Sequence, residues 1–154
     1  MKTFKEADIL LPGKEVNMEK WSVIACDQFT SEPEYWEEVK KFAGDSPSTL
    51  DMILPEVYLE QENHEEQLKN IEASMNKYLR EKVFTEYKDA MIYVERTDSV
   101  GNVRAGIVGK IDLEQYDYSK KSTSFIRATE ATVAERIPAR VEIRKNAVVE
   151  LPHV

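Results

Sequence analysis

The fold is set first by residues 63–83, which read NHEEQLKNIEASMNKYLREKV. Apolar side chains recur in this stretch every three or four residues, at Leu68, Ile71, Met75, Leu79 and Val83. This spacing places them on one face of an α-helix, with charged residues on the other. Asn63 is positioned to cap the first turn, with Glu66 three residues later. We therefore expect a helix over 64–83 that packs through a single face.

A second helix is predicted over 32–43. Ser31 and Glu34 have the spacing of a capping box, and Pro33 suits a first helical turn. Gly44 is a typical residue just beyond a helix end. The stretch 46–54 predicts a further short helical turn that is broken by Pro55.

Strands are expected on both sides of these helices. The apolar run 21–26 is typical of a short buried strand, which would place Asp27 at its carboxyl end. Segments 89–96 and 103–112 flank a turn containing Gly101 and Asn102, which predicts a β-hairpin near 89–112 with two central strands. A short extended piece is expected at 124–127, followed by a helix in which Pro138 must begin, kink or interrupt the turns.

These elements predict an α+β fold. We expect a single domain over 1–154, with a mixed or antiparallel sheet that contains the hairpin near 89–112. Helices near 32–43 and 64–83 are expected to cover that sheet. The chain ends on an apolar stretch, 148–154, which indicates a fragment of a longer protein and could support self-association.

Composition limits the classes of function. The 154 residues carry a formal charge of −8 and one cysteine, Cys26. No segment approaches the ~20 apolar residues of a membrane span, and the amino terminus lacks an apolar signal-peptide core. We expect a cytoplasmic protein that binds no membrane. The acidic balance argues against a nucleic-acid partner, and neither His64 nor His153 has a Cys or His companion for a zinc site.

Charge is distributed unevenly along the chain. Residues 1–100 hold 12 Lys and Arg against 22 Asp and Glu, whereas residues 101–154 hold 9 against 7. The basic excess surrounds a run of arginines, threonines and one glutamate: Arg127, Thr129, Glu130, Thr132, Arg136 and Arg140. Guanidinium forks and hydroxyl donors suit a phosphate or carboxylate, so this run predicts an anion-binding pocket.

Two acids could add chemistry to that pocket. Glu130 would be a general base, a magnesium ligand or the ionic partner of an arginine. Asp27 could join it in holding Mg²⁺ or deprotonating a hydroxyl. The structural alternative is that Arg136, Arg140 and Arg144 form a solvated helical stripe and that Asp27 binds only the amides of its own turn.

Three segments resemble the amino-terminal part of the DUF1015 family (domain of unknown function 1015). They are VIACDQFTSEPEYW at 23–36, LPEVYL at 54–59 and FIRATEATV at 125–133 with Arg136 and Arg140. Many members of that family carry a histidine at the position of Thr129. The resemblance implies a cytoplasmic protein and a longer natural chain, and it implies no established activity.

We expect a domain that binds a small phosphorylated or carboxylated metabolite. The residues expected to contact the anion are Arg127, Thr129, Thr132, Arg136 and Arg140. As an enzyme it would be phosphotransferase-like, with Asp27 and Glu130 as catalytic groups and Mg²⁺ as a possible cofactor. The alternative is a non-catalytic interaction or ligand-sensing domain that docks on the rest of its chain or on an acidic partner.

Overall fold

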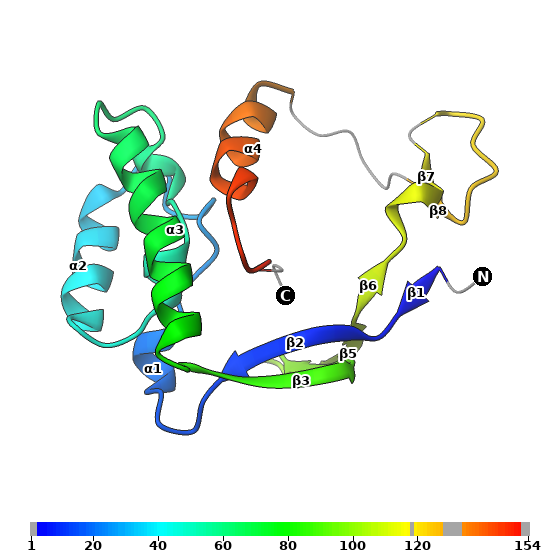
Figure 1. The fold of residues 1–154 in the computed structure, drawn as a ribbon, viewed down its shortest axis with the longest axis horizontal. Helices are drawn as coiled ribbons and strands as arrows, with labels where there is room; N and C mark the ends of the chain where they lie inside the picture. The colour runs from blue at the N-terminus through cyan, green and yellow to red at the C-terminus, as the bar shows by residue number, and fades with distance from the viewer. Residues whose placement is uncertain (1–2, 118, 128–133, 152–154) are drawn as a thin grey trace. The chain divides into compact units, whose positions relative to one another are not determined.

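The computed structural model describes residues 3–117, 119–127 and 134–151, apart from the side chains of His64, Arg136 and Ala139. Helices and short strands occupy separate runs of the chain, with most helices before Arg80 and most strands after Val83, which confirms the α+β class (Figure 1). The strands are β1 (Phe4–Lys5), β2 (Ala7–Pro12), β3 (Phe84–Ala90), β4 (Ile92–Thr97), β5 (Val103–Val108), β6 (Lys110–Ile111), β7 (Tyr116–Asp117) and β8 (Ile126–Arg127). The α-helices are α1 (Met18–Trp21), α2 (Pro33–Ala43), α3 (His64–Arg80) and α4 (Ile137–Lys145), and the 3₁₀-helices are η1 (Thr49–Met52), η2 (Glu56–Tyr58), η3 (Leu113–Gln115) and η4 (Ala134–Arg136).

The chain divides into two compact units. The strand unit comprises Met1–Leu11 and Thr85–Ala131, and the helical unit comprises Pro12–Phe84 and Thr132–Val154. The predicted hairpin belongs to the strand unit, and both predicted long helices belong to the helical unit. None of the helices in the described residues combines the length and the hydrophobicity that a membrane span needs.

The predicted hairpin is present in the strand unit. Strands β4 and β5 pair antiparallel from Ile92↔Val108 to Thr97↔Val103. Gly101 has a φ of 91°, in the left-handed region that favours glycine. The Asp98 carboxylate accepts hydrogen bonds from the amides of Val100 and Asn102, both at 2.9 Å, and so fixes the turn.

The expectation that both hairpin arms are central strands is wrong. Among the described residues β4 and β5 pair only with each other, in a two-stranded sheet. Tyr93 and Ile107 face each other across the pair and are 64% and 61% exposed. The apolar character of these arms indicated burial, but burial requires a packing partner that the pattern cannot specify.

The other strand pairs are short. Strand β2 pairs with β3, β1 pairs antiparallel with β6, and β7 pairs parallel with β8. Strand β8 confirms the extended piece expected at 124–127, although it covers only Ile126–Arg127. The sheet of the sequence prediction is therefore divided into two-stranded pieces.

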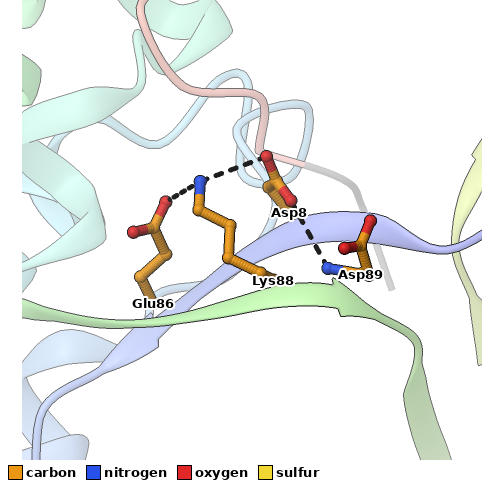
Figure 2. Close-up of polar contacts among 4 residues, drawn as sticks. All are labelled: Asp8, Glu86, Lys88 and Asp89. Carbon is orange, nitrogen blue, oxygen red and sulfur yellow. Dashed lines mark hydrogen bonds and ion pairs between the residues drawn. The ribbon is translucent and has the colours of Figure 1, made fainter.

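A polar cluster joins β2 to β3 (Figure 2). The Lys88 ammonium lies 3.2 Å from Asp8 Oδ2 and 2.5 Å from Glu86 Oε1. The second Asp8 oxygen accepts a hydrogen bond from the amide of Asp89 at 3.4 Å, where φ is 47°. Lys88 and this amide hold the pKa of Asp8 below its usual value. These groups are exposed, so salt screens their attraction and the cluster adds little to the stability of the unit. Its contacts instead tie Asp8 of β2 to Lys88 and Asp89 of β3.

Close packing explains a glycine between β5 and β6. A Cβ atom on Gly109 would lie 2.6 Å from the carbonyl oxygen of Lys5 and 2.8 Å from the Phe4 ring. Both neighbours belong to β1, which pairs with β6 through Phe4↔Ile111 and Lys5↔Lys110. A side chain at Gly109 would therefore push β1 away from β6.

Replacing Gly109 with alanine is expected to lower the free energy of unfolding by about 1–2 kcal/mol, because backbone must shift to admit the methyl group. Chemical denaturation measures this loss, and hydrogen exchange at the β1–β6 amides locates it. Gly106→Ala is the matched control, since a Cβ there meets nothing within 4 Å. Equal losses in the two variants would contradict the close packing.

The helical unit contains α2 where a helix was expected. Pro33 occupies its first turn and Gly44, with φ 58°, follows its last residue. The predicted capping box is wrong, because the cap residue is Glu32 and no side chain bonds the first amides. The chain enters α2 through a turn in which the amide of Glu32 donates to the carbonyl of Phe29 at 3.2 Å. Phe29 has a φ of 49°, so backbone geometry and not a side-chain cap sets the entry.

Helix α3 confirms the most periodic segment of the sequence, with its end at Arg80 and not at Val83. Lys82 has a φ of 56°, and the amide of Val83 turns back to the carbonyl of Tyr78 at 3.0 Å. Asn63 precedes the helix, but its side chain accepts a hydrogen bond from the side-chain amide of Gln67 at 3.2 Å. It accepts none from the backbone amides of the first helical turn, so the expected side-chain cap is absent.

The core of the helical unit gathers on one face of α3. Its buried members are Trp21, Met52, Leu54, Ile71, Met75 and Tyr78. Leu68 and Val83 pack against it as expected. Leu79 was also expected inside but is 39% exposed, and Tyr78 is buried in its place. An aromatic cluster explains the exchange, since the Tyr78 ring lies 6.0 Å from Trp21 and 6.4 Å from Phe84.

The strand predicted at 21–26 is wrong. Trp21 ends α1, whose amides are capped by the Asn17 side chain, and residues 22–25 form no ladder with any described strand. The Trp21 carbonyl accepts from the Thr49 hydroxyl at 2.7 Å, so a side chain takes the place of a strand neighbour. Asp27 consequently lies in a turn and not at a strand end. The short helical turn expected within 46–54 is confirmed as η1.

Helix α4 begins at Ile137, so Pro138 lies in its first turn, as one of the predicted options required. Thr129 and Thr132, which precede this helix in the sequence, lie outside the described residues. Beyond the helix, Val149 and Leu151 pack against the core of the helical unit, whereas Val148 is 49% exposed. Self-association through this end stays a prediction.

Candidate functional site

The residues singled out in the sequence fall in different places. Asp27 lies in the turn after α1 and Arg140 lies on α4, both in the helical unit. Arg127 belongs to β8 of the strand unit. Thr129, Glu130 and Thr132 lie outside the described residues, as does the side chain of Arg136. Of the predicted pocket residues whose side chains are described, Asp27 and Arg140 therefore lie in the same unit, and Arg127 lies in the other.

These two residues line one cavity of about 250 Å³ in the helical unit. Its floor is apolar and includes Met52, Leu54 and Met75, which are 1%, 4% and 3% exposed. Ile143, Val149 and Leu151 continue the apolar wall from α4 and the segment after it. The polar side chains of the lining are Cys26, Asp27, Arg140, Arg144 and Glu150.

Backbone contacts fix the Asp27 side of the cavity. The amide of Gln28 donates to the carbonyl of Ala25 at 3.0 Å, which closes a turn around Cys26 and Asp27. The amide of Glu56, at the start of η2, donates to the Cys26 carbonyl at 2.8 Å. This turn is thereby anchored to η2, and the Asp27 carboxylate stays exposed at the rim, where it accepts from the Gln28 side chain at 3.3 Å.

Each arginine of the cavity is paired with a carboxylate. Arg140 Nη2 lies 3.2 Å from Glu56 Oε1, and the Glu56 side chain is only 14% exposed. Arg144 Nη1 is paired with Glu150 Oε1, and both of these side chains are at least half exposed. The sequence-based site omitted Glu56, Arg144 and Glu150. The 54–59 segment quoted for the resemblance contains Glu56, but no spacing pattern indicated which arginine it would meet.

Comparison with family models decides where the chain belongs. The family described as protein of unknown function (DUF1015) matches residues 10–154. The chain belongs to the DUF1015 family. The matched region contains the whole lining of the cavity, from Cys26 to Leu151. A search of curated proteins and a search of solved structures found no match.

The one thiol of this DUF1015 chain also faces the cavity. Burial raises the pKa of Cys26, and the carboxylates of Asp27 and Glu56 raise it further, while Arg140 opposes them. The thiol is therefore protonated at neutral pH and a weak nucleophile. Asp27, Glu56 and Arg140 are therefore all close enough to act on the thiol.

Metal ligation is not supported by the described residues of the DUF1015 chain. Within them no group of three or more His, Cys, Asp and Glu side chains converges as a metal site requires. Asp27 alone does not fit the several oxygen ligands that Mg²⁺ takes. No catalytic step through magnesium can be assigned to these residues.

Proposed function

We propose that the DUF1015 chain binds a small anionic metabolite in the cavity between the Asp27 turn and α4. The anion, a carboxylate or a phosphate, contacts Arg140 and Arg144, and the rest of the molecule lies on the apolar floor. The observation that carries the proposal is that Asp27 and Arg140, far apart in sequence, line the same cavity.

Guanidinium chemistry supports this role. Arginine presents five N–H donors in a planar fork, and a single contact of Nη2 with Glu56 leaves donors for a ligand oxygen. The side chains of Arg140 and Arg144 are each 50% exposed, so solvent and ligands reach them. A concave apolar floor with a few polar groups at its rim is the usual form of a small-molecule site.

A transfer reaction is the more specific part of the proposal. The sequence predicts phosphotransferase-like chemistry with Asp27 and Glu130 as catalytic groups, and Glu130 lies outside the described residues. The described cavity supports the binding part of the proposal, in which Asp27 at the rim orients a hydroxyl or ammonium group of the ligand.

The test is calorimetric titration of the full 154-residue chain with inorganic phosphate, pyrophosphate, phosphoserine, a nucleotide and simple carboxylates, each with and without Mg²⁺. At least one is expected to bind, and Arg140→Gln is expected to weaken that binding about 10-fold to 100-fold, as for loss of a charge-assisted hydrogen bond.

Arg104→Gln is the matched control, because it removes the same charge from an exposed strand of the other unit. Its binding constants are expected to equal those of the unaltered chain. No heat with any compound would remove the proposal and leave the interaction domain as the alternative. Thermal midpoints of both variants distinguish a binding defect from unfolding.

A further inference from the structure

The two arginines of the cavity already hold carboxylates of the chain itself. Glu56 occupies Arg140 from a position that is only 14% exposed and anchored by its own backbone amide. Glu150 occupies Arg144 from the segment after α4, with a side chain that is 66% exposed. Exchange of the second pair leaves both of its charged groups in contact with water, whereas exchange of the first would take Arg140 from a carboxylate that is largely buried.

Charge around the cavity favours a monoanion. Among the described side chains, two guanidinium groups, Arg140 and Arg144, lie with the carboxylates of Asp27, Glu56 and Glu150. A ligand carboxylate that replaces Glu150 on Arg144 leaves the charge in contact with this arginine unchanged, because the exposed Glu150 side chain turns into solvent. A phosphate dianion brings one more negative charge than a carboxylate does, near the described carboxylates of Asp27 and Glu56.

The floor favours an apolar ligand body. Met52, Leu54 and Met75 offer it no hydrogen-bonding side chains, and two of the three are flexible methionines that adapt to different shapes. A cavity of about 250 Å³ accommodates a short chain and not a large cofactor.

We propose that the ligand is a monocarboxylate with a short apolar chain, whose carboxylate displaces that of Glu150 from Arg144 while the chain lies on Met52, Leu54 and Met75. Glu150 is then an internal competitor that lowers ligand affinity. This inference rests on the proposed function, because it requires the same cavity and the same arginines.

The test is titration of the full chain with butyrate, hexanoate and octanoate, with hexan-1-ol and hexyl phosphate for comparison. Affinity is expected to rise by about fourfold for each added methylene until the cavity is filled. Hexanoate is expected to bind more tightly than hexyl phosphate. The Arg144→Gln variant is expected to bind the carboxylates more weakly and to bind hexan-1-ol with unchanged affinity.

Glu150→Gln tests the competitor directly. Loss of an exposed ion pair is expected to tighten hexanoate binding roughly twofold to fivefold. Glu135→Gln removes an equal charge from η4, outside the cavity lining, and is expected to leave the affinity unchanged. Both positions are exposed, so neither variant should affect folding.

The outcomes separate the two proposals. Binding of hexyl phosphate or inorganic phosphate without binding of hexanoate overturns the monocarboxylate inference and retains the anion site. Equal affinity of Glu150→Gln and the unaltered chain for hexanoate overturns the competitor role. Absence of binding by every compound overturns both.

Discussion

Replacing Trp36 with alanine is expected to lower the free energy of unfolding by about 3–5 kcal/mol. The Trp36 side chain lies on α2 and is 2% exposed, which makes it one of the largest fully buried groups of the described chain. Its ring packs edge-to-face on Tyr35 at 5.3 Å, and its Nε1 donates to the carbonyl of Phe29 at 3.3 Å. Truncation leaves a cavity and also frees the turn that leads into the helix.

Urea denaturation followed by circular dichroism measures this loss. The fluorescence of Trp21, the remaining tryptophan, provides a second signal. Two variants act as controls. Trp36→Phe keeps most of the buried area and loses the N–H donor, so it should cost about 1–2 kcal/mol. Phe42→Ala removes a ring that is 56% exposed on the same helix and should cost less than about 1 kcal/mol. If Trp36→Ala cost no more than Phe42→Ala, the described packing of α2 would be incorrect.

Replacing Tyr78 with phenylalanine is expected to cost about 2–3 kcal/mol at neutral pH. The Tyr78 hydroxyl accepts from the buried amide of Ser48 at 3.0 Å and donates to the Asp51 carboxylate. Ser48 and Tyr78 are 1% and 3% exposed. Phenylalanine leaves the Ser48 amide without an acceptor in a place that water does not reach, and this penalty exceeds the worth of an ordinary hydrogen bond.

The loss should also depend on pH. Burial, and then the hydrogen bond to Asp51, raise the pKa of Tyr78 above its ordinary value of 10.0. An unfolded tyrosine loses its proton first, so above about pH 10 the folded chain binds more protons and its stability falls as pH rises. Below that pH the contribution of Tyr78 is fully present. The difference between the unaltered chain and Tyr78→Phe should therefore narrow above pH 10, by up to about 1.4 kcal/mol per pH unit.

Tyr93→Phe is the matched control for this prediction. It removes a hydroxyl that donates to Glu95 at 2.9 Å on an exposed strand face. Its effect should stay within about 0.5 kcal/mol at neutral pH. A Tyr78→Phe variant that behaved like this control, with a constant difference from pH 7 to 11, would contradict the buried hydroxyl network.

The sequence by itself determined the elements that depend on local rules. Helix α3 follows from apolar residues at spacings of three and four, and α2 from Pro33 and Gly44 at its two ends. The hairpin follows from Gly101, because a tight turn needs a residue that accepts a positive φ. Local conformational preferences act within a few residues, so the order of residues is sufficient to express them.

Tertiary structure decided the points at which a segment needs a partner. Residues 21–26 have the apolar pattern of a strand, yet no strand of the described chain pairs with them, and Trp21 packs on Tyr78 and Phe84 instead. The need for a packing partner also explains why Tyr78, and not Leu79, is buried in the core. Burial and pairing are properties of two surfaces, and one segment specifies only its own.

The candidate site shows the same division. Residue chemistry alone indicated Asp27 and Arg140, because arginine and carboxylate groups suit anions and proton transfer. Only the folded helical unit places both on one cavity and gives Arg140 and Arg144 their partners Glu56 and Glu150. Side-chain type follows from sequence, whereas the charge that remains available to a ligand depends on which carboxylate each arginine meets in the folded chain.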